Sequence, residues 1–403
     1  MATSRTTSIG LALIVVLTAG SAGRASAATG EPTRRTLAPS CDGISVLPGA
    51  NLQAKINAQP EGTTFCLKTG VHALTTGVLV KSRDRIIGEP GAVLDGQNLA
   101  TKGLYGFPGP TGQRDVVVAR LSFKRFRVAA ISTGWGWLVL RNNVRTSDFG
   151  VLVNSGAILR DNVIHHNRRI GVSGGPVSTI VLDGNHIAFN NTRSYDVAVH
   201  AGGIKIIGGA AGSSAIEIYR NWIHDNTGRG LWLDTNVRDV TIGENLIEDN
   251  TSHGIFYETS WDGVIRDNRV LNNAAEHAGK SCFWGSQIHV NDSQNVEIDG
   301  NEIRSSDGSN GVCAVDIDRT SISSDKVAGL FVHGNVIRLR EPGTTGLVGR
   351  PSAYQASAKN VFADNTYYVT ETGAKSWAWS TYPVGWVSWR DYGNDLNGSV
   401  RLW

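Results

Sequence analysis

The chain of 403 residues lacks several features that mark common classes of protein. No basic run indicates nucleic-acid binding, and no Cys-x-x-Cys pair indicates a zinc site. After the N-terminal segment, no stretch reaches about 18 uninterrupted apolar residues, the length that a transmembrane helix needs. No segment of about ten residues has a helical period of apolar residues. These absences predict an all-β protein with neither a nucleic-acid partner nor a membrane-spanning segment.

The N-terminus has the pattern of a secretory signal. Arg5 lies in a polar start, residues 9–18 are mostly apolar, and residues 25–27 read Ala-Ser-Ala, an A-x-A cleavage site. We therefore expect a signal peptide over residues 1–27, a flexible leader over residues 28–40, and a secreted, extracellular protein. The formal charge of +3 includes Arg5 and Arg24 and no acid of the signal, so residues 28–403 carry +1.

The four cysteines are an even number, which suits disulfides in an exported protein. Their order in the chain predicts the pairs Cys41–Cys66 and Cys282–Cys313. The second pair is 31 residues apart, a separation that fits two neighbouring strands of a repeat. We expect no metal site from these cysteines.

A short phrase recurs along the chain: an apolar residue, two variable residues, an Asn, one variable residue, and then usually Val or Ile. Its copies are centred on Asn162, Asn185, Asn221, Asn245, Asn268, Asn301 and Asn335, with looser copies at Asn143 and Asn365. The closest copies are 23 or 24 residues apart. A repeat of this length is typical of a solenoid, in which each unit buries its apolar face against the next.

The solenoid that suits this phrase is a right-handed parallel β-helix. Its Asn can adopt the left-handed region at a turn or stack as an amide ladder inside the coil. A second Asn follows five residues later, at Asn167, Asn190, Asn226, Asn250 and Asn273, and indicates a second turn on each rung. The Leu-x-x-Leu-x-Leu frame of a leucine-rich repeat is absent.

An open stack of parallel strands needs a cap at each end, because its last strand and its apolar interior are otherwise exposed. We expect residues 41–375 to form the β-helix, beginning with an N-terminal cap, and residues 376–403 to form a C-terminal cap. The five tryptophans of this last segment fit a cap better than a sugar platform: Trp377, Trp379, Trp386, Trp389 and Trp403.

Two successive repeats have nearly the same sequence, and each ends with a carboxylate residue. One runs from Asp225 to Asp234, and the other from Asp249 to Glu258. Asp234 and Glu258 are 24 residues apart, as are Asn221 and Asn245. The two carboxylates are therefore predicted on neighbouring strands, roughly 4.8 Å apart.

Strand alternation predicts which side chains point outward with this pair. Leu231, Leu233, Ile255 and Tyr257 are assigned to the interior, and the same parity is applied to the flanking rungs. The predicted outward groove then carries two adjacent acids, a cation, an aromatic pair and an imidazole: Asp234, Glu258, Lys205, Trp232, Phe256, Gln287, His289 and Asp316. Arg229 and His253, which precede the strands of the two acids, are further candidates for substrate binding.

Paired carboxylates of this kind suit acid/base chemistry on a polymer. Mutual repulsion favours one protonated and one ionised group. A separation of about 5 Å suits a retaining glycosidase, with one acid and one nucleophile. Trp232 and Phe256 could stack on sugar rings. The alternative interpretations are a solvated polar ladder on an ordinary β-helix face, or a cation site shared by the two acids.

The segments Gly230-Leu-Trp-Leu-Asp234 and Gly254-Ile-Phe-Tyr-Glu258, together with the Asn repeat, resemble secreted right-handed parallel β-helix repeat proteins. This pectate-lyase-like superfamily includes many carbohydrate-active enzymes, and the resemblance covers roughly residues 90 to 370. It implies the fold and a role on carbohydrates. The galacturonase motifs are missing as a set, and the Asp-Pro-His signature of alginate epimerases is missing too.

The leading functional prediction is a glycoside hydrolase or transglycosylase that uses Asp234 and Glu258 on a poly- or oligosaccharide and needs no cofactor. The first alternative is a β-eliminating lyase of a uronate polymer. In that case Lys205 would be the base, Arg229 or Arg266 would assist, and the two acids could hold Ca²⁺. The second alternative is a non-catalytic carbohydrate-binding solenoid.

Overall fold

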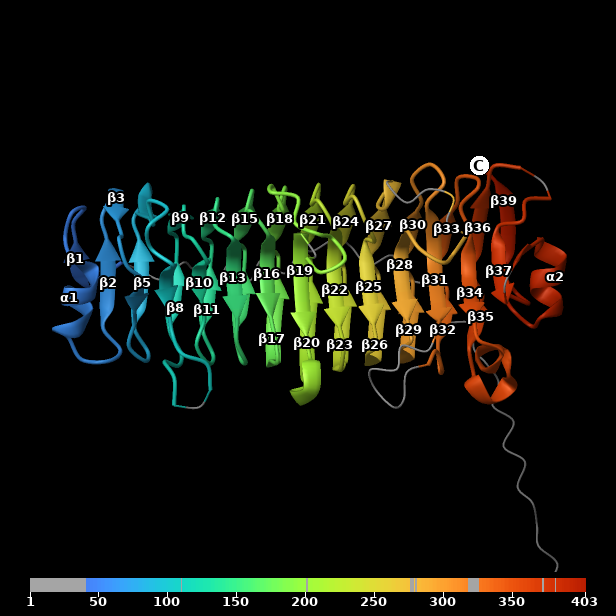
Figure 1. Cartoon of the computed structure of the whole chain (residues 1–403), viewed down its shortest axis with the longest axis horizontal. Helices are drawn as coiled ribbons and strands as arrows, with labels where there is room; N and C mark the ends of the chain where they lie inside the picture. Colours follow the sequence, from blue (N-terminus) through green and yellow to red (C-terminus); the bar gives the residue numbers. More distant parts are fainter. Residues whose placement is uncertain are drawn as a thin grey trace, which may run out of the picture. The chain divides into compact units, whose positions relative to one another are not determined.

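The computed structural model describes residues 41–109, 111–200, 202–275, 279, 281–317, 326–371, 373–380 and 382–403. The predicted signal peptide and leader lie outside these ranges. The described chain forms a parallel β-helix with three sheets of 13 strands each. Figure 1 shows successive strands of each sheet side by side in the order of the sequence. The prediction of an all-β parallel solenoid is confirmed.

Each rung contributes one strand to each sheet, which we name A, B and C. The strands of sheet A are β1 Ile44–Val46, β2 Thr64–Leu67, β5 Arg85–Gly88, β8 Val117–Ala119, β11 Leu138–Leu140, β14 Ile158–Arg160, β17 Ser178–Asp183, β20 Ser213–Tyr219, β23 Val237–Gly243, β26 Trp261–Arg266, β29 Gln294–Asp299, β32 Phe331–His333 and β35 Val361–Ala363.

The strands of sheet B are β3 Gly70–Ala73, β6 Ala92–Asp95, β9 Ser122–Lys124, β12 Asn143–Arg145, β15 Val163–His165, β18 His186–Ala188, β21 Trp222–His224, β24 Leu246–Glu248, β27 Arg269–Leu271, β30 Glu302–Arg304, β33 Val336–Arg338, β36 Thr366–Val369 and β39 Ser399–Leu402.

The strands of sheet C are β4 Val78–Leu79, β7 Lys102–Tyr105, β10 Ala129–Ser132, β13 Phe149–Val153, β16 Ile170–Gly174, β19 Gly202–Ile207, β22 Arg229–Asp234, β25 Ile255–Glu258, β28 Ser286–Asn291, β31 Asn310–Asp316, β34 Thr345–Gly349, β37 Trp377–Ser380 and β38 Tyr382–Val384. The last pair, β37 and β38, is antiparallel.

The repeated Asn forms a buried amide ladder along the stack. In one example, Asn221 Nδ2 donates to Asn245 Oδ1 at 3.0 Å, and Asn221 Oδ1 accepts from Asn185 Nδ2 at 2.9 Å. The residue before each Asn takes the positive φ of the turn, as Arg220 and Glu244 do at 53° and 56°. From the sequence, the Asn could either adopt the left-handed turn conformation or stack in an amide ladder. In the structure the Asn forms the ladder, and the residue before it adopts the left-handed conformation.

The first ladder begins at Asn142, whereas the sequence predicted its early copy at Asn143. Asn142 is buried and donates to Asn162 Oδ1, while Asn143 begins β12. The ladder ends at the C-terminus with an acid, because Asn365 Nδ2 donates to Asp395 Oδ1 at 2.9 Å. The second predicted ladder is also present and includes Asn167, Asn190, Asn226, Asn250 and Asn273.

The interior is filled by the apolar residues that alternate along each strand. In sheet C, Ile204, Leu231, Ile255 and Ile288 lie in register and belong to one continuous buried cluster. Burial of such side chains stabilises a fold by about 1.5–3 kcal/mol each. Packing between neighbouring rungs therefore stabilises the stack, as expected for a solenoid.

Short elements close the two ends of the stack. At the N-terminal end, helix α1 (Leu52–Asn57) buries Leu52 and Ile56 against the first rungs. At the C-terminal end, helix α2 (Trp386–Asp391) buries Trp389, which contacts Phe362 and Trp379 edge-on. Figure 1 shows both helices beyond the outermost strands. In the part of the chain that the structure describes, 3₁₀ helices occur at η1 Gly209–Ala211, η3 Pro351–Tyr354 and η4 Ala356–Ala358.

Both predicted disulfides are confirmed: Cys41 is bonded to Cys66, and Cys282 to Cys313. The first joins the segment before β1 to β2, and the second joins the segment before β28 to β31. Within the described ranges, the length and hydropathy of the helices do not suit a membrane span.

Candidate active site

Two columns of side chains on the outer face of sheet C form the candidate site. In the first column, Asp234 of β22 pairs in register with Glu258 of β25, and Glu258 pairs with Asn291 of β28. Adjacent strands of a sheet lie about 4.7–4.9 Å apart. The sequence-based prediction that the two acids occupy neighbouring rungs is therefore confirmed.

The second column lies two residues earlier on the same strands. Lys205 of β19 pairs with Trp232, Trp232 with Phe256, and Phe256 with His289. Trp232 and Phe256 belong to a small cluster with Trp284 that is separate from the interior cluster of Leu231 and Ile255. The alternation thus assigned the faces of these strands correctly.

Lys205 is held between a carboxylate and a loop. Its Nζ lies 3.0 Å from Asp234 Oδ2 and donates to the carbonyl of Val199 at 2.8 Å. The same Nζ lies 3.2 Å from the centre of the Trp232 ring. Burial lowers the pKa of the Lys205 ammonium, and the neighbouring Asp234 carboxylate opposes that change. Lys205 is therefore a desolvated amine beside an acid.

The two carboxylates have different surroundings. The side chain of Asp234 keeps 18% of its exposure, and it also accepts from the Thr235 hydroxyl at 2.8 Å. Glu258 is only 3% exposed, and its Oε2 accepts a hydrogen bond from Trp232 Nε1 at 2.8 Å. Solvent therefore reaches Asp234 more readily than Glu258.

A guanidinium and several rings pack beside this pair. Arg229 lies 3.9 Å from the centre of the Trp232 ring and 4.7 Å from that of Phe256. His253 stacks on Phe256, with ring centres 5.0 Å apart, and meets Trp284 edge-on. Cations over aromatic faces stabilise by about 0.5–2 kcal/mol each. This packing fixes the side chains that flank the carboxylates.

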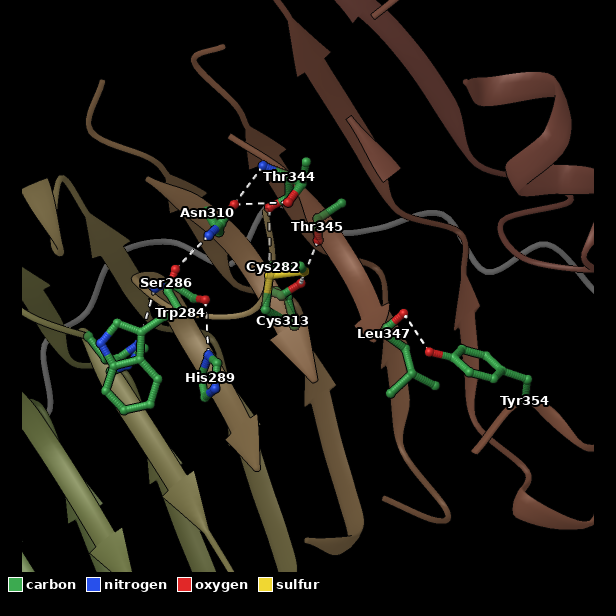
Figure 2. Close-up of a disulfide and its surroundings, with 12 residues drawn as sticks. Cys282, Trp284, Ser286, His289, Asn310, Cys313, Thr344, Thr345, Leu347 and Tyr354 are labelled. Carbon is green, nitrogen blue, oxygen red and sulfur yellow. Dashed lines mark hydrogen bonds between the residues drawn. A yellow bond between two sulfur atoms is a disulfide. The ribbon is translucent and has the colours of Figure 1, made fainter. Parts of the chain in front are cut away.

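Two loops cover much of this face, so the predicted open groove is not what the structure has. In the loop before β19, the carbonyls of Val197 and Val199 accept from Arg229 and Lys205. The segment before β28 carries Cys282 and Trp284. Figure 2 shows Trp284 and His289 close to the Cys282–Cys313 disulfide. Phe256, His253 and His289 are fully buried.

His289 is held as a neutral imidazole. Its Nδ1 lies 3.1 Å from the Ser286 hydroxyl, as drawn in Figure 2. Complete burial lowers the pKa of His289 to about 3, with a further contribution from Arg229. A fully buried histidine has no exposed surface for substrate. His289 instead packs against the rings of Phe256 and Trp284.

Two of the predicted outward residues do not lie on this face. Gln287 is buried inside the turn, where its Oε1 accepts from Asn273 Nδ2 at 3.0 Å and its Nε2 donates to Ser309. It continues the second amide ladder where the Asn phrase stops. The alternation failed here because Gln287 stands at the turn that opens β28.

The prediction that Asp316 lies in the groove is wrong. It assigned the inward and outward positions of β31 one residue out of step. Val312 and Ala314 point inward on this strand, and Val315 packs outside with Cys313. Asp316 lies at the strand end, where Arg350 Nε binds its Oδ1 and Oδ2 accepts from the Val327 amide. It stabilises the turn and does not line the site.

Sequence reasoning missed three residues of this region. Asn291 extends the column of Asp234 and Glu258, and Ser286 and Trp284 pack on the imidazoles. The position of Asn291 was available from the alternation, two residues after His289. Trp284 gave no such signal, because it lies in a loop that no repeat spacing describes.

No group of three or more His, Cys, Asp or Glu residues that could hold a metal ion occurs among the residues that the structure describes. The arrangement present offers a solvent-reachable carboxylate, a second buried carboxylate and a desolvated amine. These groups can transfer protons and stabilise a developing positive charge on a sugar.

The fold class is also identified by comparison with known proteins. A family model described as the right handed beta helix region matches residues 128–287. This match covers β10 to the start of β28 and includes Asp234 and Glu258. The chain is therefore a right-handed parallel β-helix protein. A search of curated proteins finds no match.

Several solved structures share this fold at low sequence identity. The mannuronan C-5 epimerase AlgE6 A-module of Azotobacter vinelandii is 16% identical, covers 87% of this chain and 92% of its own, and has a TM-score of 0.55. The PL6 family alginate lyase AlyGC is 11% identical with a TM-score of 0.62, over 89% of this chain and 51% of its own.

The DFA-IIIase of Arthrobacter chlorophenolicus A6, in complex with GF2, is 10% identical with a TM-score of 0.50, over 75% of this chain and 84% of its own. These three proteins differ in the reactions that their names describe. What they share with this chain is the fold.

Proposed function

We propose that this protein is a carbohydrate-active enzyme that cleaves glycosidic bonds of a poly- or oligosaccharide at the outer face of sheet C. The observation that carries the proposal is the register of Asp234 with Glu258 on β22 and β25, beside Lys205. The names of the three solved structures above, an epimerase, a lyase and a DFA-IIIase, support a role on carbohydrates for this fold.

In the proposed reaction the two carboxylates take different roles. Asp234 lies 3.0 Å from the Lys205 ammonium and serves as nucleophile or base. Glu258 lies beside Trp232 and Phe256 in drier surroundings and serves as the proton donor to the leaving oxygen. The strand spacing suits the carboxyl separation of about 5 Å in retaining glycosidases. Transfer to another sugar in place of water would give transglycosylation.

The second candidate is β-elimination on a uronate polymer, and Lys205 favours it. Burial lowers the pKa of this amine, which increases the fraction of neutral base at a given pH. Elimination needs such a base to take the proton next to the uronate carboxyl group. Arg229 would neutralise that carboxyl group. Arg266, the other predicted cation, cannot assist, because it lies at the end of β26 in sheet A. In this reaction Asp234 and Glu258 could also hold Ca²⁺.

One screen separates these candidates. The protein is incubated with neutral polysaccharides and with uronate polymers, while reducing ends and the absorbance of unsaturated uronates are both followed. New reducing ends without that absorbance support hydrolysis, and growth of the absorbance supports elimination. Loss of all turnover after calcium is removed with a chelator would favour the lyase.

The site assignment is tested with Asp234→Asn and Glu258→Gln on the substrate found in the screen. Each change should lower kcat by about 10²–10⁴-fold, the range typical of general acid–base groups. Asp239→Asn is the matched control, because Asp239 is an exposed acid on β23 of the same rung stack. If both site variants keep full activity, the assignment is wrong; binding without turnover would instead indicate a carbohydrate-binding solenoid.

We also propose that the protein works outside the cell. The two disulfides are compatible with an oxidising compartment. The N-terminal pattern predicts cleavage after residue 27. Sequencing the N-terminus of the exported protein tests both statements.

A further inference from the structure

A cleft lined by cations lies away from the carboxylate pair. It has a volume of about 450 Å³, and its charged lining residues are all basic: Lys124, Arg125, Arg145, Arg168, Arg193 and the imidazole of His166. The other lining residues are Asn and Thr. We name this surface the basic cleft.

The basic cleft follows the turns between sheets B and C over four consecutive rungs. Lys124 of β9 pairs in register with Arg145 of β12, and Arg145 with His165 of β15. Figure 1 shows the ends of β9, β12, β15 and β18 following one another along this edge. Cationic side chains are thereby placed one strand spacing apart, about 4.8 Å, although like charges on facing strand positions destabilise a sheet.

The fold neutralises only part of this charge. Asp95 serves two cations, because it lies 3.3 Å from Lys124 Nζ and also binds Arg125. Arg168 lies 3.6 Å from Asp148. Within the described residues, the side chains of Arg145 and Arg193 have neither an ion pair nor a hydrogen bond. The local excess contrasts with a formal charge of only +3 for the whole chain.

The histidine next to the cleft responds to this charge. The pKa of His165 is lowered to about 4, first by burial and then by His166, Arg145 and His186. Of these three neighbours, Arg145 is the permanently charged residue of the cleft.

We propose that the basic cleft binds an acidic polysaccharide through its carboxylate groups and guides that chain towards Asp234. This inference rests on the proposed function. Arginine forks bind carboxylates with paired hydrogen bonds, and successive rungs supply them at regular intervals. No Trp, Tyr or Phe occurs among the lining residues of the cleft, so the aromatic platforms on which nucleic-acid bases stack are missing there.

A single loop connects the basic cleft with the carboxylate pair. Thr192 and Arg193 line the cleft, and a few residues later the carbonyls of Val197 and Val199 hold Arg229 and Lys205. Between them, Tyr195 packs under Arg169, whose guanidinium lies 4.3 Å from the ring centre. A polymer bound in the cleft therefore lies next to the loop that covers the candidate active site.

The test measures binding, which does not depend on turnover. Full-length protein is titrated with fluorescently labelled fragments of polygalacturonate and of alginate, and with neutral dextran, at low salt. The variant is Arg145→Gln with Arg193→Gln, since these side chains have no partner in the described fold to lose. Arg85→Gln is the matched control, because Arg85 is an exposed arginine of β5 in sheet A.

We expect at least one uronate polymer to bind wild-type protein, with a Kd about tenfold higher or more for the double variant and changed less than about twofold for Arg85→Gln. Asp234→Asn should bind the uronate polymer as wild-type protein does. The binding result can therefore be interpreted even if the catalytic proposal fails. The inference is overturned by unchanged binding in the double variant, by no uronate binding at all, or by equal binding of dextran. Equal competition by single-stranded DNA would also overturn it, since the cleft would then be a general polyanion surface.

Discussion

Asp234 and Glu258 occupy equivalent positions of successive repeats, yet their neighbours give them different properties. Asp234 forms an ion pair with Lys205 and keeps part of its exposure, whereas Glu258 is buried and accepts a hydrogen bond from the Trp232 indole. Residues beside them differ in the same way. His289 is fully buried, while the exposed His166 faces the basic cleft. Side chains of the same type therefore differ in burial and in contacts according to their surroundings.

Burial of His289 predicts an acid-sensitive fold. Because its pKa is about 3 in the folded state, against 6.5 in the unfolded chain, only the unfolded state takes up this proton between those values. Its contribution to stability is therefore complete above pH 6.5 and declines as the pH falls towards 3. Between pH 7 and pH 5 the loss should be about 2 kcal/mol.

Denaturant unfolding at both pH values measures this effect. His289→Gln should reduce the difference between the two free energies of unfolding, although it also lowers stability at pH 7. Asn57→Ala, which changes an exposed residue without a titrating side chain, should leave the difference as in wild type. An unaltered pH dependence in His289→Gln would contradict the assignment.

The turns are the elements that hold the rungs in register. Each ladder Asn satisfies backbone groups of the preceding rung, as Asn221 does when its side chain donates to the Leu182 carbonyl and accepts from the Asn185 backbone N–H. Gln287 takes over the same task where the chain has a longer insertion before β28. The inserted loops then carry the contacts that cover sheet C.

Removing one ladder amide should be costly. In Asn221→Ala the buried Asn185 amide and the Leu182 carbonyl lose their partners, and we expect a loss of about 2–4 kcal/mol in the free energy of unfolding. Asn57→Ala, at an exposed position of α1, should change stability by less than about 0.5 kcal/mol. Denaturant unfolding compares the two, and similar effects would show that the ladder contributes little.

The disulfide of Cys282 with Cys313 should hold the Trp284 loop over the site. Replacing both cysteines by Ala should lower stability by about 2–4 kcal/mol and speed hydrogen exchange of residues 281–286. The matched control replaces Cys41 and Cys66, which are joined at the N-terminal end. Its global cost should be similar, with the exchange of residues 281–286 unchanged. Slow exchange in both variants would contradict a role of the bond in this loop.

At the scale of the whole molecule, the stack is stabilised rung by rung and must be closed at both ends. Trp389 is fully buried at the C-terminal end, and its Nε1 donates to Asp395, the acid that terminates the first Asn ladder. Trp377 is also buried there, whereas Trp403 is 45% exposed. The predicted role of the tryptophans as a cap thus holds for the buried members.

The cap predicts unequal effects for two tryptophans. Trp389→Ala should cost about 3–5 kcal/mol, because it leaves a cavity over the last rung and removes one hydrogen bond to Asp395. Trp403→Ala should lie within about 0.5 kcal/mol of wild type. Thermal unfolding of both variants tests this, and a small effect at Trp389 would mean that the end of the stack closes in another way.

The sequence predicts what depends on its period. The Asn spacing was sufficient for the β-helix and for the register of Asp234 with Glu258, and the order of the cysteines in the chain predicted both disulfides. The alternation failed for Gln287, which lies near the start of β28, and for Asp316, because the parity applied to β31 was wrong by one residue. The basic cleft was missed as well, because its arginines are scattered in the sequence and gather only at the turns.

By itself the sequence determined the repeat and therefore which residues become neighbours across rungs, since strand spacing converts a period into distance. Only the tertiary structure decided how accessible those neighbours are. Inserted loops have no period, and their carbonyls and rings fold back on Lys205, Arg229 and Phe256. Burial by such loops changes the charge and the accessibility of the side chains beneath them. The repeat spacing of the sequence does not predict this burial.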